Sequence, residues 1–234
     1  MSILKKLHLR TVLLFALGLL LFYQIWLAGH VLWWRQHNPS ESAFMHAGLE
    51  RLRQDEPDAQ LQYQWVPYNH IASSLKRAVI ASEDAKFLNH DGFDWEGMQN
   101  AWEKDIHKHR IVAGGSTISQ QLAKNLFLSG QRTPWRKAEE AIITVMLEHM
   151  LSKHRIFEIY LNVIEWGNGI YGAEAASKHY FHCHAQQLNN DQAAWLAAII
   201  TNPEYFDDHR SAHRARRKAA ILRRRMFAVD VPRQ

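Results

Sequence analysis

Two adjacent acids, Glu83 and Asp84, end a stretch in which apolar residues recur at helical spacing. Phe87 and His90 follow within two helical turns. A carboxylate at the end of an apolar helix can face a cleft while the helix behind it fixes its position, which is what a general base requires. The segment is therefore compatible with a general base, although on its own it favours the other interpretation, a solvated acidic helix end beside a core phenylalanine.

A glycine-rich loop precedes the next expected helix, residues 118–127, and reads Gly114, Gly115, Ser116 and Thr117. Free backbone N–H groups and the positive end of a helix dipole favour a phosphate at such a position. Gln120 and Gln121 could bind sugar hydroxyls, and Lys124 lies about two turns after Thr117, on a similar face. The Walker spacing G-x-x-x-x-G-K is absent. An ordinary capped helix with polar surface residues is the alternative.

Cations gather at the start of a further expected helix, where a Thr-Pro pair predicts the first turn. They are Arg132, Arg136 and Lys137. The helix dipole disfavours cations at this end, so the local conflict indicates an anionic ligand. The alternative is a surface pair between Arg136 and Glu140, which would contribute only about 0.3–0.5 kcal/mol.

The elements that must position these residues are predicted to be helices. Helical spacing runs from residue 71 to the two acids, and then over 93–104, 118–127, a long segment after residue 134, 156–163, 173–180 and 191–200. The long segment has a wide apolar face and is expected to cross the core. No run of alternating strands is found, so the fold class is predicted to be mainly α.

The N-terminal segment predicts a membrane anchor. Residues 11–34 carry no charged side chain, and 24 helical residues span about 36 Å, enough to cross a bilayer with some tilt. Lys5, Lys6 and Arg10 precede the run and only Arg35 closely follows it, so residues 1–10 are expected in the cytoplasm and the rest outside. A cleaved signal peptide and a buried helix are the alternatives, but the run is long and lacks an A-x-A site.

Composition adds broad limits. The formal net charge of +5 suits an anionic partner such as a phosphate, a pyrophosphate or a membrane surface. Cys183 is the one cysteine, so no intramolecular disulfide is possible, and the histidines show no zinc-binding spacing. The basic segment 214–225 is expected to be a solvated helix face, with anionic lipid contact as the second interpretation. The exported topology argues against nucleic-acid binding.

In this order, the segments closely resemble the peptidoglycan glycosyltransferase domain of bifunctional penicillin-binding proteins and monofunctional transglycosylases. The first family pattern is E-D-x-x-F-x-x-H-x-G, met by Glu83, Asp84, Phe87, His90 and Gly92. The second is G-x-S-T-x-x-Q-Q-x-x-K-N, met by Gly114, Ser116, Thr117, Gln120, Gln121, Lys124 and Asn125. The third is R-K-x-x-E, met by Arg136, Lys137 and Glu140. The fourth is K-x-x-I-x-E-x-Y-L-N, met by Lys153, Ile156, Glu158, Tyr160, Leu161 and Asn162. The match runs from about Ile71 to about Pro203.

The resemblance implies a mainly α, lysozyme-like, bilobal domain with its smaller lobe beside the membrane. We expect residues 11–34 to be the transmembrane helix, 35–68 a connecting segment and 69–234 the glycosyltransferase domain. The 234 residues leave no room for a transpeptidase domain, so the monofunctional type is expected. Ser73 and Lys76 fit S-x-x-K but lack the S-x-N and K-T-G partners, which indicates coincidence.

The resemblance also implies the reaction, which joins lipid II disaccharides into β-1,4 glycan strands by inverting transfer and releases undecaprenyl pyrophosphate. It assigns Glu83 as general base and Glu140 as a second essential carboxylate. Cations would stabilise the leaving pyrophosphate, and these are Lys124, Arg132, Arg136 and Lys137. A mobile stretch closing over the substrate would contain Gly115, Ser116 and Thr117. Further substrate-binding residues would be Asp84, Phe87, His90, Gln120, Gln121 and Asn125.

The resemblance also implies the cofactors, the partners and the location of the protein. No tightly bound cofactor is expected, and a divalent cation, Mg²⁺ or Mn²⁺, is expected to stimulate. The partners are lipid II, the growing lipid-linked strand, the membrane, and cell-division or wall-synthesis proteins. The location is the cytoplasmic (inner) membrane, crossed once, with the catalytic domain in the periplasm. Two other classes remain. A lytic transglycosylase or lysozyme-type hydrolase lacks the second and third motifs, and a tethered glycan-binding scaffold would not need Glu83.

Overall fold

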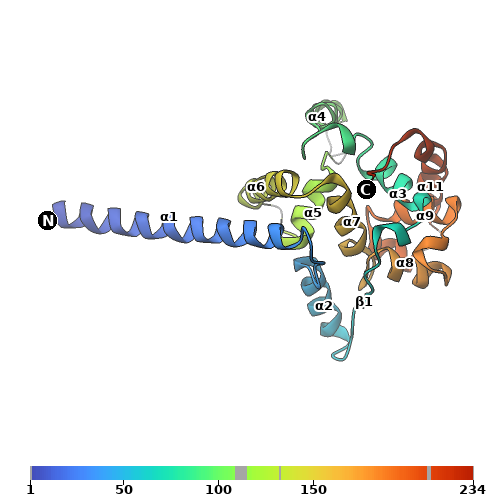
Figure 1. Cartoon of the computed structure of the whole chain (residues 1–234), viewed down its shortest axis with the longest axis horizontal. Helices are drawn as coiled ribbons and strands as arrows, with labels where there is room; N and C mark the ends of the chain where they lie inside the picture. The colour runs from blue at the N-terminus through green and yellow to red at the C-terminus, as the bar shows by residue number, and fades with distance from the viewer. Residues whose placement is uncertain (1, 109–114, 132, 210–211, 234) are drawn as a thin grey trace.

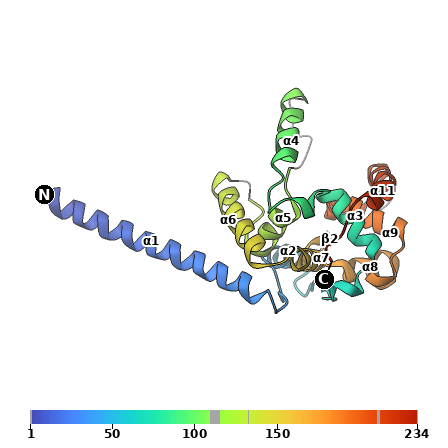
Figure 2. The ribbon, with the colours of Figure 1, turned by 45° about the horizontal axis from the view of Figure 1, so that its top comes forward.

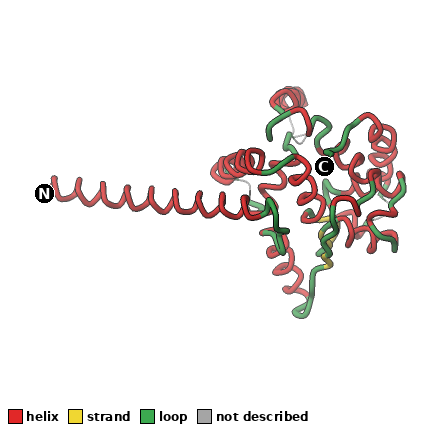
Figure 3. Tube along the Cα trace, viewed as in Figure 1, coloured by secondary structure: helices red, strands yellow, loops and turns green. Residues whose placement is uncertain are grey.

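The computed structural model describes residues 2–108, 115–131, 133–209 and 212–233. Helices dominate the described chain, which confirms the mainly α prediction (Figure 3). A long helix, α1 (Ser2–Trp33), projects from the body that the other elements form (Figure 1). It contains one segment, Arg10–Trp33, that is long and apolar enough to cross a membrane, and it fits a single-pass anchor.

The C-terminal end of α1 packs against the body. Leu27 and Val31 are fully buried, although most other apolar residues of the helix are exposed. They lie one turn apart on a single helix face, and the main neighbour of α1 is α6 (Pro134–Met150). The anchor is therefore joined to the body through side-chain packing as well as through the chain.

Residues 35–68, expected to connect the anchor to the domain, contain several elements. They are α2 (Ala43–Asp55), strand β1 (Gln62–Tyr63) and the start of the 3₁₀ helix η1 (Tyr68–His70). Asn162 ties this segment to the core, because its amide exchanges two hydrogen bonds of 3.0 Å with the backbone of Val66. The backbone of Gly172, with φ +83°, lies so close to Asn162 that an added Cβ would be 2.6 Å from the Asn162 carbonyl oxygen.

The central part of the body contains α3 (Ser73–Glu83), α5 (Ile118–Phe127) and α7 (Lys153–Val163). Helix α5 packs against both α6 and α7. The 3₁₀ helix η2 (Phe87–Asn89) follows α3, and α4 (Trp95–Lys108) projects away from the other helices (Figure 2). The interior is apolar and includes the fully buried rings of Phe87, Phe157 and Tyr160.

The C-terminal part is also helical. Its elements are α8 (Ala173–Phe181), η3 (Ala185–Gln187), α9 (Asn190–Ile199), α10 (Pro203–Asp208), α11 (His213–Arg225) and η4 (Met226–Ala228). Helix α9 lies against both α3 and α11. This packing places α11, the basic segment of the sequence, beside the helix that ends in Glu83.

A small sheet not predicted from the sequence joins distant segments. Strands β2 (Glu165–Gly167) and β3 (Ile170–Tyr171) are antiparallel, and β1 runs parallel to β3, which gives the order β1-β3-β2. Gln62 pairs with Ile170 and Tyr63 with Tyr171. The β2–β3 register pairs Glu165 with Tyr171 and is irregular before Gly167.

Candidate active site

Glu83 ends α3, and its side chain is 9% exposed. The Ser82 hydroxyl donates to Oε1 at 2.7 Å, and the Lys218 ammonium lies 3.7 Å from the same oxygen. The Gln121 amide donates to Oε2 at 3.2 Å. Donors from α3, α5 and α11 thus hold both oxygens and fix the position of the carboxylate, as a general base requires.

The direction of the Gln121 amide is fixed by Tyr160. The Tyr160 hydroxyl donates to Gln121 Oε1 at 2.9 Å, so the amide nitrogen is the atom that points at Glu83. Tyr160 is fully buried, and burial above all raises its pKa, with further contributions from Glu83 and Asp84. The phenol therefore stays protonated and keeps its role as a donor. This residue of the fourth motif reaches Glu83 through one intermediate side chain.

Asp84 points to a different set of partners. His90 Nε2 lies 3.0 and 3.1 Å from its two carboxylate oxygens, and the backbone N–H of Ile118 donates to Oδ2 at 3.0 Å. The Gly92 N–H donates to His90 Nδ1 at 3.2 Å, which leaves Nε2 as the donor nitrogen. Asp84 therefore holds the first turn of α5 beside the end of α3, and the predicted substrate contacts of Asp84 and His90 remain predictions.

The loop before α5 is held by its own side chains. Thr117 and Gln120 form a reciprocal capping box, with hydrogen bonds of 3.2 and 3.0 Å, and both are 2% exposed. The Thr117 hydroxyl donates to the Gly92 carbonyl at 2.7 Å. Gly92 has φ +90°, and an added Cβ would lie 2.8 Å from Thr144 Cγ2, so glycine is required there. The structure thus accounts for Thr117 and Gln120 as capping residues.

The other predicted residues of the second motif lie on both sides of this cap. Gly115 is exposed and Ser116 is half-buried. Lys124 lies one turn after Gln121, and its ammonium is 5.1 Å from the ring centroid of Phe44 in α2. Asn125 is buried and donates to the Gln121 carbonyl at 2.7 Å. The predicted Gly114 and Arg132 lie outside the described residues.

Glu140 is a buried carboxylate, only 3% exposed, between two cations of α6. Arg136 Nη1 lies 2.8 Å from Oε2, and Lys137 pairs with Oε1. Because Glu140 is buried, this is not the weak surface pair considered from the sequence. Lys137 remains 46% exposed. Arg136 Nε is buried and has no hydrogen-bond partner among the described residues. The cluster carries one more positive than negative charge at the start of a helix, which suits an anionic group.

Phe87 and Lys153, from the first and fourth motifs, contact each other. Phe87 is fully buried, 5.6 Å from the ring of Phe157, and the Lys153 ammonium lies 4.5 Å from its centroid. Lys153 also pairs with Glu148 at 2.8 Å. In the described structure Phe87 is a core residue, and its backbone N–H donates to the Asp84 carbonyl at 3.0 Å.

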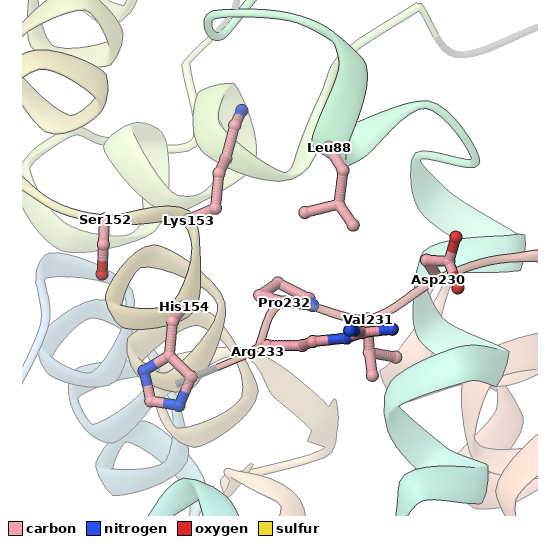
Figure 4. A pocket seen from close by; sticks show the side chains of 8 residues that line it. All are labelled: Leu88, Ser152, Lys153, His154, Asp230, Val231, Pro232 and Arg233. Atoms are coloured by element: carbon pink, nitrogen blue, oxygen red, sulfur yellow. The ribbon is translucent and has the colours of Figure 1, made fainter.

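A hollow of about 730 Å³ lies elsewhere, between the start of α7, η2 and the C-terminal segment (Figure 4). Leu88, Lys153, His154 and Arg233 are among its walls, and burial above all lowers the pKa of His154. Neither Glu83 nor Glu140 lines it. The candidate site therefore follows from the side-chain contacts, not from the size of a hollow.

Sequence reasoning missed Lys218. The segment 214–225 was expected to be a solvated face, and its exposed arginines agree, but Lys218 is half-buried and reaches Glu83. Ala215 and Leu222 are buried at helical spacing around it, a signal that could have placed Lys218 on the inner face. Across the described residues, no cluster of three or more His, Cys, Asp or Glu side chains could hold a metal ion.

Comparisons with known proteins agree on one family. A family model described as Transglycosylase matches residues 50–227. The chain is similar to a Methylobacillus flagellatus protein named biosynthetic peptidoglycan transglycosylase, with 63% identity over 220 residues that cover 94% of this chain and 96% of that one. A protein of the same name from Chromobacterium violaceum is 60% identical over 212 residues, 91% of this chain and 93% of its own. One from a Janthinobacterium species is 52% identical over 232 residues, 99% of this chain and all of its own.

Proposed function

The chain belongs to the transglycosylase family, and we propose that it polymerises lipid II into β-1,4-linked glycan strands and releases undecaprenyl pyrophosphate. At the coarser level, it is a peptidoglycan glycosyltransferase. The observation that carries the finer proposal is the Glu83 carboxylate, held by donors on both oxygens at the end of a buried helix.

Glu83 acts as the general base of an inverting displacement. The 4-hydroxyl of the acceptor sugar attacks the anomeric carbon of the donor strand, and its proton passes to the Glu83 carboxylate. The bond from the anomeric carbon to the pyrophosphate oxygen breaks, and the electron pair leaves with the pyrophosphate. Support for this role comes from the fixed orientation of the carboxylate, whose Oε2 accepts the Gln121 amide N–H at 3.2 Å.

The leaving pyrophosphate is stabilised by cations of α5 and α6, because fixed positive charge favours the charge that develops on it. Arg136 and Lys137 are the strongest candidates, since Glu140 holds both at the start of α6. We assign the same role to Lys124 and Arg132. Glu140 orients the two cations. A divalent cation, Mg²⁺ or Mn²⁺, would add positive charge to the same pyrophosphate without being tightly bound.

The membrane arrangement is part of the proposal. Residues 1–10 lie in the cytoplasm, α1 crosses the inner membrane once, and the body lies in the periplasm, where lipid II and the growing strand are presented. An apolar groove between α1 and α6 supports this placement, with Leu20 of α1 and Trp135 and Ile142 of α6 on its walls. Trp135 and Ile142 are exposed beside the anchor, as expected for residues in contact with lipid.

We also propose that the chain has no transpeptidase activity. In the S-x-x-K pattern, Ser73 is exposed at the start of α3. The Lys76 ammonium is buried, where it donates to the Tyr68 carbonyl at 2.9 Å and lies over the Tyr68 ring. Because Lys76 is engaged with Tyr68, it is not placed to activate Ser73 as a nucleophile.

The product of the reaction tests the proposed function. Purified protein in detergent is incubated with labelled lipid II, with and without Mg²⁺, and the products are separated by length. The proposal predicts long glycan that muramidase cuts and one undecaprenyl pyrophosphate for each bond formed. Cleavage of finished peptidoglycan without polymer would favour the hydrolase class, and folded protein without either activity would favour a scaffold.

A further inference from the structure

Helix α11 presents most of its cations to solvent. Arg214, Arg216, Arg217 and Arg224 are exposed, whereas Lys218 is half-buried on the face that carries Ala215 and Leu222. That face packs against α9 and α3. One cation of the helix is thus directed inward, toward the end of α3 that carries Glu83.

Lys218 and Ser82 share one oxygen of Glu83. The Ser82 hydroxyl has one proton and two acceptors, Glu83 Oε1 at 2.7 Å and the Ala197 carbonyl at 3.0 Å. Whenever Ser82 donates to Ala197, the Lys218 ammonium at 3.7 Å remains as a cationic partner of Oε1. Two partners therefore act on Oε1, while Gln121 contacts Oε2.

The hydrogen-bond donors to Glu83 described above carry no charge. Gln121 of α5 and Ser82 of α3 are neutral, and the Tyr160 phenol of α7 is kept protonated. Asp84 is engaged by His90 and the first turn of α5. On α11 itself, the positive charge of Arg214 lowers the pKa of Lys218.

Lys218 is held by packing in a position that disfavours its charged form. Burial above all lowers the pKa of Lys218, Glu83 opposes this effect, and Arg214 adds to it. A lysine of ordinary exposure would stay in water with the arginines of the same helix. The packing of α11 on α9 instead holds it beside the carboxylate, at 30% side-chain exposure.

We propose that Lys218 is a positioning residue, whose positive charge beside Oε1 holds the Glu83 carboxylate so that Oε2 accepts the proton of the acceptor hydroxyl. This inference rests on the proposed function of Glu83 as general base. It names a part of the catalytic apparatus that lies outside the four sequence motifs, on the C-terminal helix.

The inference has a defined signature in the pH dependence of the rate. On the acid side, the rate falls as Glu83 takes up a proton. A nearby positive charge opposes that proton, so the fall should begin at a higher pH when Lys218 is replaced by a neutral residue. A cation at about 4 Å typically lowers the pKa of a carboxylate by one unit or more, so we expect the acid limb to shift by about one pH unit.

The experiment compares kcat and KM for lipid II polymerisation between about pH 4 and pH 9 in the full-length protein. The variants are Lys218→Met, which removes the charge, Lys218→Arg, which keeps it, and Arg224→Met, which removes an exposed charge from the same helix. We expect the acid limb of kcat to move up by about one unit in Lys218→Met alone. Lys218→Gln replaces Lys218→Met if the latter does not fold.

Three results would overturn the inference. They are an unchanged acid limb in Lys218→Met, an equal shift in Lys218→Arg, and a higher KM for lipid II with an unmoved limb, which would make Lys218 a substrate-binding residue. These outcomes differ from a failure of the proposed function, in which the wild-type protein itself would make no polymer.

Discussion

Tyr160 is the residue whose importance is best tested on its own, because it touches Glu83 only through Gln121. Tyr160→Phe keeps the buried ring and removes the hydroxyl, so the Gln121 amide loses the contact that fixes its direction. The loss of one hydrogen bond, worth about 0.5–1.5 kcal/mol, predicts a fall in kcat of about 2- to 12-fold. The measurement is the polymerisation rate at saturating lipid II.

The exposed Tyr205 supplies the control for that prediction. Tyr205→Phe should leave kcat at the wild-type value. If Tyr160→Phe were equally active while remaining folded, the hydrogen-bonded series from Tyr160 to Glu83 would have no role in the reaction.

Prediction from the sequence was uneven at this scale. The motifs brought Glu83, Gln121 and Tyr160 to attention, and the structure places them in contact. The capping role of Gln120 was not predicted, because a glutamine beside a glycine-rich loop fits a cap and a sugar contact equally well. Lys218 was missed because segment 214–225 contains many cations, and the basic run alone does not show which of them packs toward the core.

At the scale of elements, Arg155 joins the anchor to the body. Its Nε donates to the Trp34 carbonyl at 2.8 Å, and its Nη2 donates to the His37 carbonyl at 2.6 Å. Its Nη1 lies 2.5 Å from Glu158, which also accepts the Tyr68 N–H. One guanidinium therefore fixes the chain that leaves α1 to the start of α7.

Arg155→Lys should release this connection, because an ammonium cannot reproduce the planar set of donors. Hydrogen exchange of the amides of residues 34–42 is expected to become faster by several-fold, with α7 unchanged. Arg35→Lys, at an exposed arginine of the same segment, is the matched control. Equal exchange in wild type and Arg155→Lys would mean that packing of Leu27 and Val31 alone holds the end of α1.

Glu165 of β2 makes stability depend on pH. Burial raises its pKa from 4.5 to about 7, although Arg51 opposes the rise. The folded state then binds this proton more tightly than the unfolded chain does. The stabilisation is complete below about pH 4.5 and is lost as the pH rises through about 7.

Glu165→Gln should therefore flatten the dependence of the melting temperature on pH between about pH 5 and pH 8. Thermal unfolding in detergent at both pH values measures this, and the exposed Glu56→Gln serves as the control. An unchanged pH dependence in Glu165→Gln would show that other groups determine it.

The helices themselves were predicted closely. The expected segment 118–127 is α5, 173–180 ends one residue before α8 does, and 191–200 is shifted by one residue at each end relative to α9. Periodicity and caps such as Thr133 with Pro134 explain this agreement. The sheet was not found, because strands of two or three residues are too short to show alternation.

At the scale of the whole molecule, the anchor and the catalytic body form one packed unit. The C-terminal end of α1 is buried against the body, and the Tyr23 hydroxyl donates to Glu139 of α6 at 2.5 Å. Glu139 precedes Glu140, which holds Arg136 and Lys137. The proposed pyrophosphate site therefore lies on a helix that also contacts α1.

In the proposed mechanism, the Glu83 carboxylate accepts the proton of the acceptor hydroxyl. The most direct test measures two quantities on one preparation of Glu83→Gln, the binding of lipid II and the rate of its polymerisation, beside wild type and Glu56→Gln. If Glu83 is the general base, lipid II binding is expected within a few-fold of wild type and the rate is expected to be lower by about 10²- to 10⁴-fold. A folded Glu83→Gln protein that polymerises lipid II at nearly the wild-type rate would contradict it.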